Sequence, residues 1–162
     1  MTDRVMGRTY RRRVYRGSRD KYSVEQQAGV VSMPTTGQDV QVEVVPSTAI
    51  QGMRKVKHLT VSLAARDITG SNSDICYWAL VYVPQGTAVN TLSLTGGTGM
   101  YEPNQFVMNC GVADFSAGPC RFSSPVSRNL NSGDRVVLIL NGGSIAAERF
   151  FCYVVKYAIT LQ

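Results

Sequence analysis

The residues best suited to bind a ligand lie at the start of the chain, where arginines and tyrosines are closely interleaved. Residues 8–16 alone contain five arginines and two tyrosines. A guanidinium group binds a phosphate through two parallel hydrogen bonds, and a tyrosine ring stacks on an unpaired base. The sequence therefore predicts a nucleic-acid-binding segment, whose candidate residues are Arg4, Arg8, Tyr10, Arg11, Arg12, Arg13, Tyr15, Arg16, Arg19 and Lys21.

The positive charge of the chain is concentrated in this same segment. Residues 1–25 hold eight cationic and three anionic side chains, a net charge of +5, while the whole chain has a net charge of +6. Closely spaced arginines repel one another, and no apolar periodicity here offsets the entropy lost on ordering. We therefore expect residues 1–27 to form a disordered basic arm that becomes ordered on a polyanion. Fully extended, 25 residues span at most about 80 to 90 Å.

Basic segments of this kind have other uses as well. A run of cations also serves as a solubilising tail or as a nuclear-import signal. The concentration of charge favours nucleic-acid contact, with which an import role is compatible. A second basic cluster, Arg54, Lys55 and Lys57, lies at the start of a predicted strand. It either extends the nucleic-acid surface or is a solvated strand end, and the sequence favours neither.

Residues 28–162 have the length and composition of one folded domain. The chain is 44% apolar and 17% charged, with 15 glycines and 6 prolines, a composition typical of strand-rich proteins with many turns. No apolar run reaches the roughly 18 residues of a membrane-spanning helix, and charges occupy the place where a signal peptide needs an apolar stretch. We expect no membrane partner and no secretion through such a signal.

Alternating apolar and polar residues predict about eight strands and no helix longer than two turns. This pattern favours an all-β, antiparallel β-sandwich. The segment Ile75–Val83 is apolar on both faces, so we expect it in the centre of a sandwich or under a subunit contact. Residues 84–104 are predicted to form a long loop. The strand ranges are 30–34, 39–46, 55–65, 75–83, 106–110, 121–126, 135–140 and 149–161.

No set of residues in the sequence is typical of an enzyme or of a metal site. His58 is the single histidine, and the acidic residues fall mostly at turns, where carboxylates bond neighbouring amides. We therefore predict no catalytic activity, no cofactor and no metal. The cysteines lack metal-ligand spacing and lie in or beside apolar runs, so buried, reduced thiols are expected at Cys76, Cys110, Cys120 and Cys152.

Four segments of the body, together with the arm, carry a resemblance to a known family. They are Arg54–Val61, Met100–Val107, Gly118–Ser124 and Ser127–Leu138. Together they resemble capsid proteins of small circular Rep-encoding single-stranded DNA (CRESS) viruses, particularly the nanovirus-like ones. The same architecture looks like that of satellite necrosis virus coats, which enclose RNA. The resemblance covers most of residues 54 to 140, and the arm is similar in composition only.

The resemblance implies a single eight-stranded jelly roll with two four-stranded sheets. It also implies assembly of sixty copies into a T=1 icosahedral shell, with the arms inside on single-stranded DNA, or on RNA. Sixty arms would supply about +300 charges, enough to neutralise roughly 300 nucleotides. Such a protein would be found in the virion and, during assembly, in the host nucleus. It would have no membrane partner and no small-molecule substrate.

Two other classes of protein are alternatives. A monomeric single-strand-binding module would need exposed aromatic side chains on one strand face, whereas Tyr77, Trp78 and Tyr82 lie in strongly apolar sequence. A carbohydrate-binding or trimeric signalling jelly roll would have no use for the arm. Size-exclusion chromatography separates the first alternative from a shell, because a 17.7 kDa monomer elutes far from a megadalton particle.

Overall fold

The computed structural model describes residues 22–66, 75–143 and 147–161. The arm residues up to Lys21 lie outside these ranges. The described chain forms nine strands and two single-turn 3₁₀ helices. No helix among the described residues is long and apolar enough to cross a membrane. In chain order, the elements are β1 (Ser23–Met33), β2 (Val40–Val45), β3 (Arg54–Ala65), β4 (Ile75–Val83), η1 (Asn104–Phe106), β5 (Val107–Asp114), η2 (Phe115–Ala117), β6 (Cys120–Ser124), β7 (Arg128–Leu130), β8 (Arg135–Asn141) and β9 (Arg149–Leu161).

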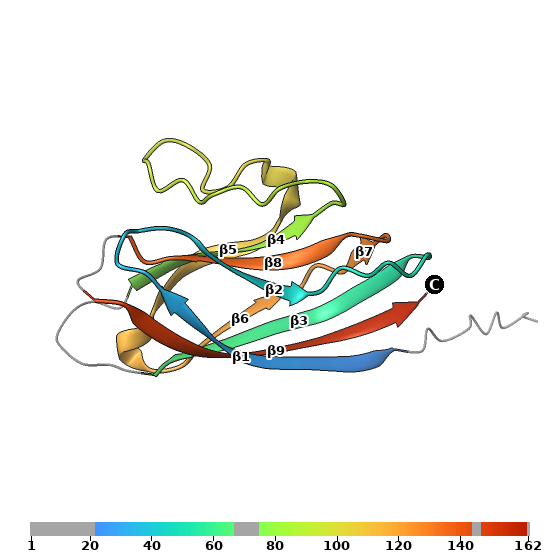
Figure 1. Cartoon of the computed structure of the whole chain (residues 1–162), viewed down its shortest axis with the longest axis horizontal. Coiled ribbons are helices and arrows are strands. Elements are labelled where there is room, and N and C mark those ends of the chain that lie inside the picture. The colour runs from blue at the N-terminus through green and yellow to red at the C-terminus, as the bar shows by residue number, and fades with distance from the viewer. Residues whose placement is uncertain (1–21, 67–74, 144–146, 162) are drawn as a thin grey trace, which may run out of the picture.

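The strands form two antiparallel sheets packed as a sandwich, which confirms the predicted all-β, antiparallel sandwich, although the described strands number nine and not eight (Figure 1). The five-stranded sheet has the order β1-β9-β3-β6, and β7 also pairs with β3. The four-stranded sheet has the order β2-β8-β4-β5. The ninth strand arises because β6 and β7 pair with successive parts of β3, Leu59–Leu63 and Arg54–Val56. Pro125 lies between β6 and β7 and has no N–H group with which to continue the ladder.

The observed strands agree with the sequence patterns wherever apolar residues alternate or run continuously. β4 and β9 have the predicted bounds, β3 and β8 differ by one residue at one end, and β2 is one residue shorter at each end. In contrast, β1 begins at Ser23, although the predicted strand begins at residue 30. Its first residues are exposed and, apart from Val24, polar, and among the described strands they pair with β9 alone. The predicted boundary between arm and body at residue 27 therefore falls inside β1.

Most of the apolar side chains are buried between the two sheets, where Trp78 and Phe122 stack with ring centroids 4.3 Å apart. A second apolar cluster lies on the outer side of the four-stranded sheet, where Leu92 and Tyr101 pack against Ala79 and Ile139. These two covering residues belong to the loop between β4 and η1 (Figure 1). The second apolar face of β4 is therefore covered by its own chain, an arrangement that the sequence alone does not predict.

The four cysteines differ in their environments. Cys76 is buried, and burial raises the pKa of its thiol to about 12. Cys120 is half-buried, while Cys110 and Cys152 are exposed because they lie on the outer sides of their sheets. All four are free thiols. The prediction of four buried thiols is therefore wrong for Cys110 and Cys152, since an apolar stretch of sequence does not reveal which face of a strand its cysteine occupies.

Candidate nucleic-acid interface

The outer face of the five-stranded sheet carries four cationic side chains. Residues that pair directly in a sheet share a face. Thr60 pairs with Lys156, and Ser62 pairs with Arg121, on the side opposite the buried pair Val61 and Val155. The same alternation places two lysines of β3 on the outer side, opposite Ala158 and Thr160 of β9. We define this cationic face by Lys55, Lys57, Arg121 and Lys156.

The charge of the body is divided unevenly between its two sheets. The strands of the five-stranded sheet contain seven lysines and arginines but a single acidic residue, Glu25. The strands of the four-stranded sheet contain one cation, Arg135, and two acids, Glu43 and Asp114. A polyanion is therefore attracted to one side of the sandwich.

A β-bulge in β3 contributes to the cationic face. Between Lys57 and Thr60 the register against β9 shifts by one residue, and His58 adopts a left-handed conformation with φ 54°. Val56 and Leu59 are both fully buried although they are three residues apart. The extra residue lets both side chains face the core while Lys57 and His58 lie outside. Leu59, Val61 and Leu63 all face the core.

The arm enters the body at this same face. β1 starts at Ser23, which pairs with Ile159 near the end of β9, the strand that also lies beside Lys57. The Nζ atom of Lys57 lies 4.7 Å from the centre of the Tyr22 ring, a cation–π distance. The predicted arm residues themselves precede Tyr22 and lie outside the described ranges. Their point of attachment nevertheless lies beside the cationic face.

Arg54, the third member of the predicted basic cluster, is buried inside the body. Its guanidinium donates hydrogen bonds to the carbonyl oxygens of Pro46, at 3.1 Å, and Asp134, at 3.2 Å. Only 8% of the residue is exposed, and its Nε has no hydrogen-bond partner. Arg54 therefore joins two loops and is not placed to contact a nucleic acid, unlike its neighbours Lys55 and Lys57. Alternation along β3 separates them, because position 54 faces inward.

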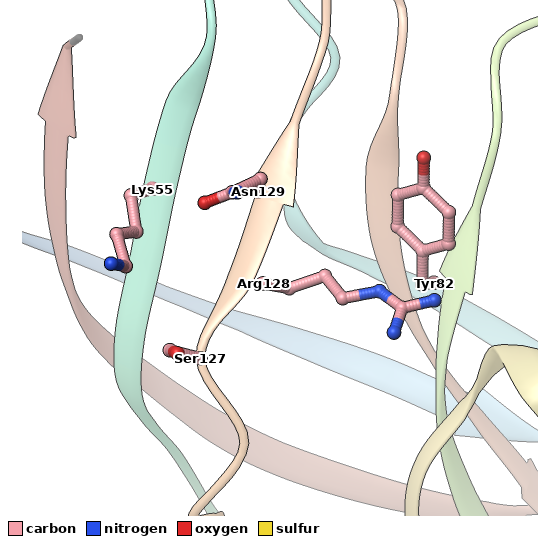
Figure 2. Close-up of a pocket in the computed structure, with 5 residues that line it drawn as sticks. All are labelled: Lys55, Tyr82, Ser127, Arg128 and Asn129. Atoms are coloured by element: carbon pink, nitrogen blue, oxygen red, sulfur yellow. The ribbon is translucent and has the colours of Figure 1, made fainter.

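A pocket of about 480 Å³ opens at the end of the cationic face (Figure 2). It is lined by Lys55 of β3, Tyr82 of β4 and three consecutive residues at β7: Ser127, Arg128 and Asn129. The Cζ atom of Arg128 lies 4.6 Å from the centre of the Tyr82 ring. Its Nη2 donates a hydrogen bond of 3.4 Å to the carbonyl oxygen of Gln105. These contacts fix the guanidinium at the rim of the body.

Asp134 anchors the tyrosine on which this guanidinium rests. The Tyr82 hydroxyl donates a hydrogen bond of 2.6 Å to the Asp134 carboxylate, which also accepts from the backbone N–H groups of Gln85 and Asn131. Burial alone would raise the pKa of Asp134, but these hydrogen bonds stabilise the carboxylate and lower it overall. Burial and the adjacent carboxylate raise the pKa of Tyr82 to about 12. The tyrosine therefore stays neutral and remains a donor at physiological pH.

Sequence reasoning missed Arg121, Arg128 and Lys156. Each is an isolated cation in a strand segment, without the clustering that draws attention to Arg54, Lys55 and Lys57. Alternation does place Lys156 and Arg121 on the polar sides of their strands. What the sequence lacks is the strand order that brings those polar sides onto one face.

The described residues contain no group of three or more histidine, cysteine, aspartate or glutamate side chains that could hold a metal ion. The chain matches no protein-family model, and no curated protein shows significant sequence similarity to it.

Proposed function

We propose that this protein is a viral coat protein, sixty copies of which form a small T=1 icosahedral shell around single-stranded nucleic acid. The observation that carries the proposal is the position of the cations. The arm, with its net charge of +5 over residues 1–25, is continuous with a sheet face bearing Lys55, Lys57, Arg121 and Lys156. The arm joins the body beside this face, at Tyr22 and Ser23, and the resemblance described above favours DNA as the cargo.

The connections of the sandwich support a jelly-roll topology for the body. Counted as one interrupted strand, β6 and β7 give eight strands in two sheets of four. With that count, every connection between consecutive strands except β4–β5 crosses from one sheet to the other. A double-sheet sandwich of eight antiparallel strands is the architecture of many viral coat domains.

The charge of the face extends what the arm can neutralise. Four cations per copy add about 240 positive charges to the roughly 300 of sixty arms. At one phosphate per cation, the two together would neutralise roughly 540 nucleotides. Binding of this kind depends on charge and stacking, so we expect packaging with little sequence preference and with strong salt dependence.

Exposed apolar side chains support association between copies. On the four-stranded sheet, Ile75 of β4 is 44% exposed and Val112 of the edge strand β5 is 58% exposed. Contacts between subunits would remove such side chains from water, which is the main favourable term in protein association.

Deletion of residues 1–21 tests the proposal. We expect the full chain to form shells that contain nucleic acid and the shortened chain to form empty shells. Electron microscopy gives the assembly state, and the ratio of absorbance at 260 and 280 nm gives the nucleic-acid content. If the full chain stays monomeric and binds oligonucleotides, the coat-protein proposal is wrong and the protein is a single-strand-binding module. Normal packaging by the shortened chain would show that the arm assignment is wrong.

Two matched variants separate the charge of the arm from its length. Arginines 8, 11, 12, 13 and 16 are changed together to lysine in one variant and to glutamine in the other. We expect the lysine variant to package and the glutamine variant to lose most of its cargo, because phosphate neutralisation requires charge. Equal packaging by both variants would contradict the electrostatic role.

A further inference from the structure

The pocket at β7 has two cationic side chains whose charges are not used within the described structure. No carboxylate of the described residues forms an ion pair with Lys55 or Arg128. The pocket lining contains no acidic residue. Outside residues 1–25 the chain has nine cations and eight acids, so a pocket lined by two cations and no acid has the electrostatics of an anion site.

Arg128 is held in one orientation before any ligand arrives. The Tyr82 ring covers one face of its guanidinium, and the carbonyl of Gln105 accepts from Nη2. The Tyr82 ring is in turn fixed by its hydrogen bond to Asp134 and by an edge contact with Phe106. A guanidinium has five N–H donors, so one hydrogen bond to Gln105 leaves donors for a ligand. Holding this side chain in advance lowers the entropy lost on binding.

The two cations lie on opposite sides of β7 (Figure 2). Arg128 extends from β7 toward Tyr82, whereas Lys55 lies on the neighbouring strand β3, on the same side as Asn129. The Ser127 side chain points to the same side of β7 as Asn129, and its hydroxyl and the Asn129 amide are potential donors. A single phosphate group therefore meets one cation at a time, whereas a chain of phosphates can meet both.

We propose that this pocket binds two phosphate groups of one stretch of single-stranded nucleic acid, one at Lys55 and the other at Arg128. Ser127 and Asn129 donate hydrogen bonds to the backbone that passes between them. Lys55 also belongs to the cationic face. The bound nucleic acid would therefore leave that face at Lys55 and turn over the edge of the sheet at β7. The proposal rests on the proposed single-stranded cargo. It adds a site on the folded body, apart from the arm, at which that cargo is bound.

Arginine footprinting of the full chain tests this proposal. Protein stripped of nucleic acid in high salt is labelled with phenylglyoxal, and the reactivity of each arginine is read by peptide mass spectrometry. A ten-nucleotide oligothymidylate is the probe. We expect it to reduce labelling of Arg128 and of the arm arginines, and to leave labelling of Arg135 on the four-stranded sheet unchanged.

The same footprint separates failure of this proposal from failure of the proposed function. Protection of the arm arginines without Arg128 would overturn the pocket site and leave the packaging role intact. Protection of none of these arginines would count against both. Inorganic phosphate and polyglutamate at equal charge concentration are the comparison ligands. If inorganic phosphate protects Arg128 as well as oligothymidylate does, the pocket does not recognise a chain of linked phosphates. If polyglutamate protects Arg128 equally well, the pocket is not specific for nucleic acid.

Two substitutions give an independent measurement. We expect Arg128→Gln and Lys55→Gln each to weaken oligothymidylate binding about tenfold at low salt, because each removes a charged hydrogen-bond donor. Arg135→Gln is the matched control and should change the affinity less than twofold. The Lys55 variant keeps the test valid if Arg128→Gln fails to fold, since Lys55 is on the outer face of β3. Unchanged affinity in Lys55→Gln would contradict the proposal.

Discussion

The two sheets of the sandwich differ both in charge and in what covers their outer faces. The strands of the five-stranded sheet carry seven cations and one acid, and its outer face is open among the described residues, with Arg121, Phe150 and Lys156 exposed. The strands of the four-stranded sheet carry one cation and two acids, and the loop that contains Leu92 and Tyr101 covers part of the outer face. An apolar outer face needs a cover, whereas a cationic outer face is stable in water until a polyanion binds.

This difference explains why the near-neutral charge of the body is misleading. The chain outside residues 1–25 has a net charge of only +1, which suggests that all binding resides in the arm. The charges of the body are instead separated by sheet, so that one face attracts phosphate while the other buries apolar loop residues. Net charge describes a surface only when the distribution of that charge is known.

Removal of the covering tyrosine should give the largest effect on stability. Tyr101 is 3% exposed in the cluster over the four-stranded sheet. We expect Tyr101→Ala to lower the free energy of unfolding by about 3 kcal/mol, through lost burial and the cavity left behind. Phe150→Ala is the matched control, because Phe150 is 38% exposed on the open face, and it should cost less than about 1 kcal/mol. Urea unfolding measures both, and equal losses would contradict the comparison.

Removal of cations from the open face should change binding while leaving stability nearly constant. The double variant Lys156→Gln and Arg121→Gln removes two exposed cations. We expect the slope of log affinity for oligothymidylate against log salt to become shallower by about 1.4, or about 0.7 per lost phosphate contact. The free energy of unfolding should change by less than about 0.5 kcal/mol. An unchanged slope would show that the cationic face does not contact the oligothymidylate.

The smallest effect is expected at the bulge of β3. His58 is the one non-glycine residue with positive φ in the part of the chain that the structure describes. Glycine adopts this conformation without the clash of a Cβ atom, although it loses more entropy on folding. We expect His58→Gly to raise the free energy of unfolding by about 0.5 kcal/mol, while His58→Val, with its branched Cβ, lowers it. Thermal unfolding of both variants gives the sign of each change in stability. A valine variant more stable than the unaltered protein would contradict the positive φ at position 58.

Strands could be predicted wherever their own pattern of apolar and polar residues is sufficient to identify them. Ile75–Val83 and Arg149–Leu161 were recognised to the residue because continuous or alternating apolar residues define them. The start of β1 could not be predicted, because Glu25, Gln26 and Gln27 become a strand only by pairing with β9. Tertiary pairing there outweighs local preference.

The candidate interface was predicted only in part, for a similar reason. The sequence identified Lys55 and Lys57 by their closeness to each other, and it grouped Arg54 with them although alternation turns that side chain inward. Arg121 and Lys156 join the same face through strand order, which no local pattern contains. The pocket at Arg128 depends on Tyr82, 46 positions earlier in the chain, whose ring holds the guanidinium.

The break between β6 and β7 has a consequence for how copies of the body can grow into larger assemblies. These strands form one rim of their sheet, and an uninterrupted rim invites another chain to add its own strand, which leads to open-ended fibres. Here the rim offers five residues, then Pro125 and an unpaired segment, then three more. An incoming strand would find too short a ladder to hold. Continuation of the five-stranded sheet from copy to copy is thereby disfavoured at this rim.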